Sequence, residues 1–284
     1  MPSLQNIRRR IGSVKNTQKI TKAMKLVSGA KLRRAQDRIL AARPYAQKMA
    51  ELLQGLGASV QRDLHPLWAN RGERRIHLLV IAADRGLCGS FNANIVRKAL
   101  EVIREKERKG LQVDLTLVGK KARDYFRKRP YTLRKTWTNI FDKLDFGHAA
   151  EIARDIEQAF LEGQFDVCDL IFTEFRSAAS QRVVVERLLP IGAMDSAAST
   201  SYLYEPSEEE IFERLLPKYI EVQLFRSLLE SNASELGARM MAMDAATRNA
   251  QEMIYKLTRV YNKTRQAAIT KELMDIIGGA EALK

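Results

Sequence analysis

The sequence has few residues of the kinds that build covalent or metal-centred sites. Its 284 residues include 2 cysteines and 3 histidines. Cys88 and Cys168 form no CxxC pair and have no metal-ligand spacing, and His65, His77 and His148 are scattered along the chain. None of these histidines lies within ten positions of Cys88, so no neighbouring base would activate its thiol. We expect reduced, buried cysteines and no catalytic residue, metal or cofactor in this chain.

The sequence also lacks long apolar runs. No stretch approaches the roughly 18 consecutive apolar residues that a membrane-spanning helix needs. The first 13 residues, MPSLQNIRRRIGS, contain no apolar core of a secretory signal. We therefore expect a chain that is neither membrane-spanning nor secreted.

Acidic residues are scarce at the amino terminus. Residues 1–48 contain 13 Lys or Arg and the single acid Asp37, so this segment carries most of the net charge of +14. A solvated helix face would normally mix both signs, and a one-signed face indicates an acidic partner. The cations are Arg8, Arg9, Arg10, Lys15, Lys19, Lys22, Lys25, Lys31, Arg33, Arg34, Arg38, Arg43 and Lys48.

The chemistry of that partner is constrained by the lack of aromatic residues. The first aromatic is Tyr45, so the basic stretch has no platform for base stacking and no Trp or Phe to anchor it in a lipid interface. An acidic protein surface suits the segment better than nucleic acid or lipid. A basic coiled-coil protein that binds nucleic acid or acts as a scaffold remains the alternative interpretation.

Proline is absent and glycine nearly absent from residues 218–277, where Gly237 is the one exception. As one helix this run would be about 90 Å long, which no compact core of this chain could cover. Ser207 and Glu210 predict a capping box at the start of the helical region, Pro217 is a site for a bend, and Gly278-Gly279 predicts its end.

Apolar residues in this run recur with alternating gaps of four and three, the pattern of a coiled-coil seam. Small and flexible side chains dominate, so the seam should pack closely without being a strong zipper. A long helix in an ordinary bundle is the competing interpretation. The seam is Leu236, Met240, Met243, Thr247, Ala250, Ile254, Leu257, Tyr261, Thr264 and Ala268, with Met253, Val260, Ala267 and Met274 in a row beside it.

The amino-terminal segment, residues 1–58, also predicts a long helix. Ser3 can cap it, and Pro44 is a site for a kink. Gly12 and Gly29 weaken the prediction by about 1 kcal/mol each relative to alanine. An apolar stripe runs through Leu4, Ile7, Ile11 and Val14. It then shifts by one position and continues through Ile20, Met24 and Val27.

The middle of the chain alternates strand and helix patterns, which predicts a mainly parallel sheet covered by helices over residues 72–200. The two long helices would pair antiparallel, with this Rossmann-like α/β domain inserted between them, and the second helical region would span 207–284. Strands are expected at 75–83, 113–119, 133–141, 166–175 and 181–189, and helices at 92–109, 120–129 and 148–163.

The turn Asp84-Arg-Gly-Leu-Cys-Gly89 lies between a predicted strand and helix, where phosphate-binding loops also occur. It matches neither GxGxxG nor GxxxxGK[ST], which supply the backbone donors for a nucleotide. We expect Gly86 and Gly89 to permit a tight turn. Asp84 and Arg85 would then serve local hydrogen bonds or a partner contact.

Four motifs together resemble the gamma subunit of F-type ATP synthase, and they span the whole chain in the order of that family. They are Ile7-Arg-Arg-Arg-Ile11, Asn16-Thr-Gln-Lys-Ile-Thr-Lys-Ala-Met24, Asp84–Gly89, and Tyr261-Asn-Lys-Thr-Arg-Gln-Ala-Ala-Ile-Thr270 with Glu272 and Gly278-Gly279-Ala280.

The resemblance implies a central rotor shaft. Its helical pair would turn inside a ring of alpha and beta subunits, and the α/β domain would sit with epsilon on the c-ring. The catalytic residues would then belong to alpha and beta, and asymmetric contacts would couple ion-driven rotation to ATP synthesis or hydrolysis.

The resemblance also assigns contacts by position. Arg265, Gln266 and Thr270 correspond to polar contacts with beta-subunit loops, and Lys22, Met24 and Lys25 to the segment that passes acidic loops of beta. The same acidic loops would be the partner of the basic residues, including Arg8, Arg9 and Arg10. The remaining assignments are Tyr202, Tyr204 and Glu205 against the c-ring and epsilon, and Ile276, Ile277, Ala280 and Leu283 as the tip in the upper bearing.

One departure separates the chain from a branch of that family. It has no inserted cysteine pair of the chloroplast kind, and no transit peptide precedes Met1. We therefore expect a bacterial protein, attached peripherally to the cytoplasmic face of the inner membrane.

Overall fold

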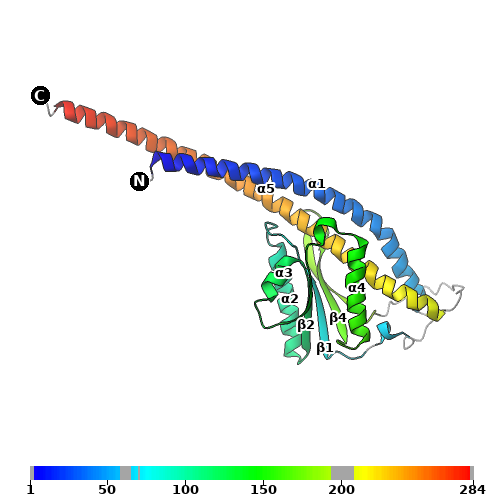
Figure 1. Cartoon of the computed structure of the whole chain (residues 1–284). Coiled ribbons are helices and arrows are strands. Elements are labelled where there is room, and N and C mark those ends of the chain that lie inside the picture. The colour runs from blue at the N-terminus through cyan, green and yellow to red at the C-terminus, as the bar shows by residue number, and fades with distance from the viewer. Residues whose placement is uncertain (1–2, 58–64, 70, 193–207, 282–284) are drawn as a thin grey trace. The chain divides into compact units, whose positions relative to one another are not determined.

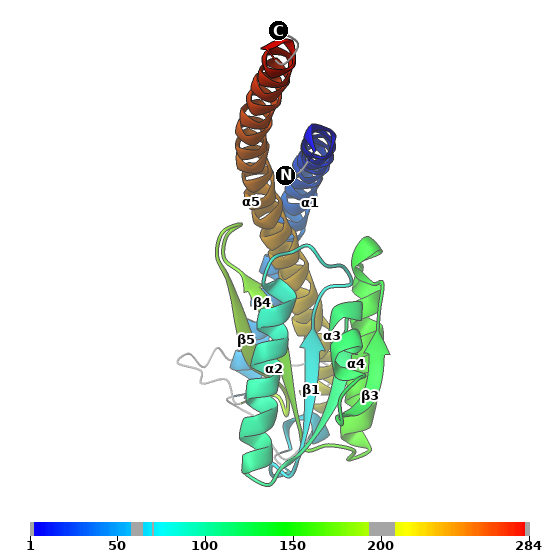
Figure 2. The ribbon, with the colours of Figure 1, turned by 90° about the vertical axis from the view of Figure 1, so that its left-hand side faces the viewer.

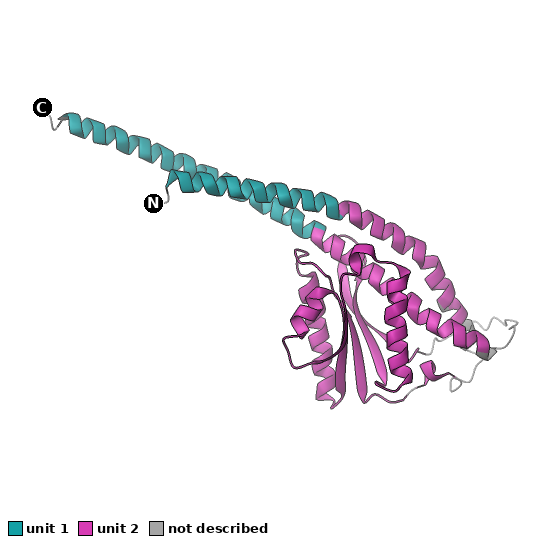
Figure 3. Cartoon of the chain, in the orientation of Figure 1, with its two compact units in different colours: residues 1–28, 240–284 teal, residues 29–239 magenta. Residues whose placement is uncertain are grey.

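A computed structural model describes residues 3–57, 65–69, 71–192 and 208–281. Its contacts divide the chain into two units, each drawn in its own colour in Figure 3. One unit combines residues 1–28 with residues 240–284, and the other comprises residues 29–239. The first and last segments of the chain therefore belong to the first unit, and a single continuous segment makes the second.

Two helices account for the long predicted runs. Helix α1 spans Leu4–Gly57 and α5 spans Glu208–Glu281, which are 54 and 74 residues. Ser3 caps α1, because its Oγ accepts a hydrogen bond from the Asn6 N–H at 3.3 Å. Each helix contains a proline, Pro44 and Pro217 respectively, without being interrupted there.

The predicted helix end at Gly278-Gly279 is wrong, because α5 continues through both glycines to Glu281. Neither glycine has a positive φ. A glycine costs a helix about 1 kcal/mol relative to alanine but does not forbid helical geometry. The predicted capping box at Ser207 lies outside the described residues.

The predicted seam of α5 is confirmed by the burial of its side chains. Leu236, Met243 and Ala250 are buried, and the other seam positions through Ala268 are half-buried. The neighbouring row of Met253, Val260, Ala267 and Met274 is exposed. The pairing with α1 is antiparallel, since Gln18 contacts Gln251 while Lys25 contacts Asp244.

The predicted slip in the stripe of α1 is wrong. After Leu4, Ile7, Ile11 and Val14, the seam continues in unbroken heptads through four polar residues, and Ile20 and Val27 are 60% and 57% exposed. Hydrogen bonds and an ion pair with α5 satisfy three of these polar side chains, which is why they occupy the seam. The four are Gln18, Thr21, Lys25 and Ser28, of which Thr21 and Ser28 are buried.

The second unit contains a five-stranded sheet in the order β3-β2-β1-β4-β5. The first four strands are parallel and β5 pairs antiparallel with β4, so the predicted mainly parallel sheet is confirmed. The strands are β1 (Arg75–Ile81), β2 (Gln112–Val118), β3 (Thr132–Trp137), β4 (Val167–Phe175) and β5 (Gln181–Leu189).

Helices cover both faces of this sheet (Figure 1). On one face, α2 (Phe91–Arg108) and α3 (Lys120–Phe126) bury a core with β1 and β2. On the other lie α4 (Phe146–Leu161) and the part of α5 within this unit, whose Ser234 Oγ donates to the Thr173 carbonyl at 3.1 Å. Figure 2 shows α2 in front of the sheet and α5 behind it.

Two predicted elements end earlier than the sequence suggested. Helix α3 stops at Phe126, four residues before Pro130, and β3 stops at Trp137 rather than at residue 141. Asn139 has a φ of 64°, which breaks the extended conformation, and the short 3-10 helix η3 (Phe141–Lys143) follows it.

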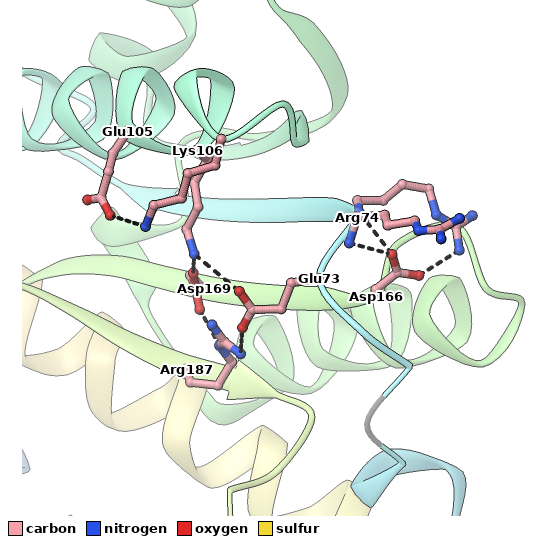
Figure 4. A network of polar contacts seen from close by, with 9 residues as sticks. Glu73, Arg74, Glu105, Lys106, Asp166, Asp169 and Arg187 are labelled. Carbon is pink, nitrogen blue, oxygen red and sulfur yellow. Dashed lines mark hydrogen bonds and ion pairs between the residues drawn. The ribbon is translucent and has the colours of Figure 1, made fainter.

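A network of ionic contacts holds the amino-terminal ends of β1 and β4 to the carboxyl end of β5 (Figure 4). Asp169 of β4 is buried and accepts from Arg187 of β5 at 2.6 Å, and Arg187 also contacts Glu73 at 2.9 Å. Beside it, Asp166 accepts from Arg75 at 2.7 Å. Burial alone would raise the pKa of Asp166, but hydrogen bonds from Arg75 and from the Arg74 and Arg75 backbone outweigh it, and the net shift is downward.

The single glycine of the 60-residue run marks the contact between α5 and the β4–β5 turn. Gly237 is buried, and a Cβ at this position would lie 3.3 Å from both the Cα and the carbonyl oxygen of Ala178. The neighbouring atoms belong to backbone, which cannot rotate aside. Glycine is therefore favoured by the close approach of the turn rather than by helix geometry.

Replacing Gly237 with leucine is expected to lower the free energy of unfolding by about 2 kcal/mol, because the new side chain overpacks the turn. Gly12 of α1 provides the matched control, since it is also helical but has no atom within 4 Å of a Cβ. Gly12→Leu should be neutral or stabilising. Urea unfolding of both variants measures the difference, and equal stabilities would contradict the packing argument.

Candidate interaction surface

Three polar contacts cross the seam of the first unit. Gln18 Nε2 lies 2.5 Å from Gln251 Oε1, Thr247 Oγ1 lies 2.8 Å from Thr21 Oγ1, and Lys25 Nζ lies 2.5 Å from Asp244 Oδ1. The hydrogen bond from Lys25 lowers the pKa of Asp244. These contacts fix α1 and α5 side by side through directional bonds as well as through apolar packing.

The basic residues assigned to partner contacts differ in whether they already form an ion pair within the protein. Arg8, Arg9, Arg10 and Lys22 are exposed and have no ion pair within the described part of the chain. Lys25 is different, because it is already paired with Asp244 across the seam. The predicted partner role of Lys25 therefore competes with a contact inside the protein, whereas the other four cations are available.

The polar set Arg265, Gln266 and Thr270 lies on the exposed side of α5. The Thr270 hydroxyl donates to the Gln266 carbonyl at 3.0 Å, one turn earlier in the same helix. The guanidinium of Arg265 and the amide of Gln266 have no hydrogen-bond partner among the described residues, so both can donate to another molecule.

The carboxy-terminal turns of α5 are exposed on all sides, since every residue from 269 to 280 is exposed. This part includes the predicted tip residues Ile276, Ile277 and Ala280. A helix of about a dozen residues that packs on nothing is marginal in water, and contiguous exposed apolar surface marks an interaction site. Its large apolar side chains, 49–68% exposed, are Ile269, Leu273, Met274, Ile276 and Ile277.

Four predicted contact residues lie outside the described residues. They are Tyr202, Tyr204 and Glu205, assigned to the c-ring and epsilon, and Leu283, assigned to the tip. Their assignments stay predictions.

The Asp84–Gly89 turn uses its polar groups internally. Asp84 Oδ1 accepts from the backbone N–H groups of Lys120 at 3.0 Å and Asn139 at 2.9 Å. Asn92 Oδ1 accepts from the Ala83 N–H at 3.0 Å. The turn thus connects the carboxyl ends of β1, β2 and β3, which is the edge where a nucleotide would bind in a related sheet. A structural role is supported over a phosphate-binding one.

The conformation of this turn corrects one detail of the sequence interpretation. Gly89 has a φ of 58°, as a tight turn requires, but the second left-handed residue is Leu87, at 63°, and not Gly86. Leu87 is 65% exposed. Arg85 forms an ion pair with Asp142 at 3.1 Å, so it also serves a local contact.

Both cysteines are free thiols and buried, as predicted. Burial raises the pKa of the Cys88 thiol and raises that of Cys168 further. Both thiols therefore stay protonated and unreactive near neutral pH. Within the described ranges, no cluster of His, Cys, Asp and Glu is suited to a metal ion, and no helix is long and apolar enough to cross a membrane.

Sequence reasoning missed the polar contacts across the seam and the outward positions of Ile20 and Val27. The signal was present, because the heptad spacing that begins at Leu4 continues through Gln18, Thr21, Lys25 and Ser28. Following apolar character instead of spacing produced the error.

Comparisons with known proteins match the whole chain. A family model described as ATP synthase matches residues 3–283. A protein of Geobacter sp. (strain M21) named ATP synthase gamma chain is 48% identical over 287 residues, and its counterpart in Anaeromyxobacter sp. (strain Fw109-5) is 50% identical over 290 residues. Each alignment covers 100% of both chains.

Solved structures share the fold. A chain in the central stalk and c-ring structure of the Tetrahymena thermophila mitochondrial ATP synthase is 29% identical, with a TM-score of 0.62, over 80% of this chain and 99% of that one. A chain in the OSCP/F1/c-ring structure of the Euglena gracilis mitochondrial ATP synthase has a TM-score of 0.75 at 24% identity, over 99% and 94% of the respective chains. At that identity the Euglena match bears on the fold alone.

Proposed function

Because this chain belongs to the ATP synthase gamma chain family, we propose that it forms the central rotor shaft of a bacterial F-type ATP synthase. It would couple ion-driven rotation of a c-ring to ATP synthesis or hydrolysis in alpha and beta subunits. The chain itself would be non-catalytic, and it would associate peripherally with the cytoplasmic face of the inner membrane through the c-ring. We further propose that it works as three parts, a helix of residues 1–58, an α/β domain of residues 72–200 and a helix of residues 207–284.

The observation that carries this proposal is the exposed end of α5. Residues 269–280 form a helix that is exposed throughout within the described part of the chain, with five large apolar side chains on its surface. Such a segment gains stability when a surrounding protein removes its apolar surface from water. A ring of subunits that encloses the tip would supply that cover, and weak apolar contacts have no fixed direction, which would permit turning.

The polar residues suggest how force would pass to the catalytic subunits. Arg265, Gln266 and Thr270 would hydrogen bond to loops of beta, while Lys22 and Arg8–Arg10 would face acidic loops of beta. Met24 is half-buried beside this row and Lys25 is paired with Asp244, so we propose that Lys25 contributes mainly by ordering the helix pair. Tyr202, Tyr204 and Glu205 would contact the c-ring or epsilon.

Co-purification tests the proposed function. An affinity tag is placed in the α/β domain, and the full-length chain is expressed in its own host. Purification should recover six larger subunits with bound nucleotide and with ATPase activity. Removing residues 269–284 should weaken the retention of these subunits without unfolding the α/β domain, because this domain lies in the other unit of the chain. Recovery of the chain alone, or with nucleic acid, would contradict the proposal.

A further inference from the structure

The amino-terminal part of α1 offers two seams that compete for the same position. One is the observed row of Gln18, Thr21, Lys25 and Ser28, and the other is the apolar row of Ile20, Met24 and Val27. The rows are displaced by about one residue, which corresponds to a rotation of roughly 100° about the axis of α1. Each rotational setting would present a different face of α1 to α5.

Within residues 18–28, apolar burial alone favours the setting that is not observed, whereas Ile7, Ile11 and Val14 pack in the observed one. In the structure, Ile20 and Val27 are 60% and 57% exposed, while Thr21 and Ser28 are 8% and 3% exposed. Burial of isoleucine and valine is favourable, whereas burial of hydroxyl groups is favourable only when they are hydrogen-bonded. Within this segment another interaction must therefore hold the observed setting, in addition to the apolar residues that precede it in the seam.

The three cross-seam contacts are the available interaction. Gln251, Thr247 and Asp244 of α5 each meet a polar side chain of α1 at 2.5–2.8 Å. A 100° rotation would separate all three pairs and would place Ile20 and Val27 against the Asp244 carboxylate and its neighbours. Hydrogen bonds and ion pairs are directional, and polar seam residues are known to select one arrangement of a coiled coil at some cost in stability.

We propose that the Gln18–Gln251, Thr21–Thr247 and Lys25–Asp244 pairs lock the rotational setting of α1, so that Ile20 and Val27 face outward. These are positioning residues, since they act on the orientation of a surface and not on a reacting atom. Contact between this outward face and the surrounding subunits rests on the proposed function. The lock itself is a property of the chain alone.

Cysteine labelling distinguishes rotation from simple loosening. Ile20→Cys reports a residue exposed only in the observed setting, Ser28→Cys reports one that is buried there, and Leu26→Cys reports a position on the far side of α1 that is exposed in both. A neutral maleimide is used on the full-length chain. The native thiols give a low background because Cys88 and Cys168 are buried with raised pKa values.

Lys25→Asp places like charges opposite each other at Asp244 and should favour the other setting. The labelling rate at Ile20→Cys should then fall roughly fivefold and that at Ser28→Cys should rise roughly fivefold, while Leu26→Cys stays unchanged. Adding Asp244→Lys restores the pair with reversed charges and should return all three rates to their original values.

Opposite changes at the two reporter positions support the lock. Faster labelling at all three positions would indicate fraying, and unchanged rates would indicate that the pair does not set the rotation; either result overturns the proposal. In the assembled enzyme, Lys25→Asp should reduce proton pumping per ATP hydrolysed, with recovery in the reversed pair. Normal coupling alongside altered labelling would instead count against the proposed role of the outward face and leave the lock intact.

Discussion

Replacing Gly119 with alanine is expected to unfold the α/β domain. Gly119 follows β2 with a φ of 95°, and a Cβ at this position would lie 2.1 Å from the Ala82 carbonyl oxygen. The clash is with backbone at the end of β1, and the Gly119 N–H donates to the Trp137 carbonyl at 2.8 Å, so the residue cannot move without breaking the sheet edge. We expect a loss of about 4 kcal/mol or more, which is a large part of the stability of an ordinary domain.

Gly110 separates the two causes of this effect. It also has a positive φ, at 75°, but no atom lies within 4 Å of a Cβ there. Gly110→Ala should therefore show only the left-handed strain, about 1 kcal/mol. Denaturant unfolding followed by Trp137 fluorescence in a Trp68→Phe background measures both variants. A Gly119→Ala variant as stable as Gly110→Ala would show that the backbone moves aside.

Reversing the charge of the amino-terminal basic face is expected to abolish coupling in the assembled enzyme. Four exposed cations that form no ion pair with the described part of the chain would become acids and would repel acidic loops instead of attracting them. Because each lost charge contact costs about 1 kcal/mol, the four together cost about 4 kcal/mol, and the affinity for the other subunits should fall roughly 1,000-fold. The variant carries Arg8→Glu, Arg9→Glu, Arg10→Glu and Lys22→Glu.

A matched variant controls for net charge. It reverses four exposed cations of the α/β domain, and so lowers the chain's net charge of +14 by the same amount. ATP-driven proton pumping in membrane vesicles is the readout, and thermal unfolding verifies that both chains fold. Normal pumping by the amino-terminal variant would contradict the acidic-partner account. The control carries Arg97→Glu, Arg104→Glu, Arg108→Glu and Lys128→Glu, all at exposed positions.

Much of the fold could be predicted because its signals are local. The strand patterns gave all five strands, and β5 begins and ends at the predicted residues Gln181 and Leu189. The absence of proline and the heptad spacing gave α5 and its seam. Errors occurred at helix and strand ends, as at Phe126 and Gly278, where capping and packing decide between similar local preferences.

The candidate surface was less predictable, because exposure depends on what lies opposite. Apolar character suggested that Ile20 and Val27 were inside, but Gln251, Thr247 and Asp244, more than 200 positions away, provide the partners that place polar residues there instead. The resemblance located Lys25 on a contact surface. Only the structure revealed that its ammonium group is already paired.

By itself, the sequence determined that two long helices flank an α/β domain, that no metal-centred chemistry is expected, and which family the chain resembles. These follow from periodicity, composition and motifs, which are local properties of the sequence. The tertiary structure decided the rotational setting of α1, the close contact that favours glycine at position 237 and the left-handed conformation of Leu87. Each of these depends on atoms distant in sequence, since hydrogen bonds and close packing act between neighbours in space.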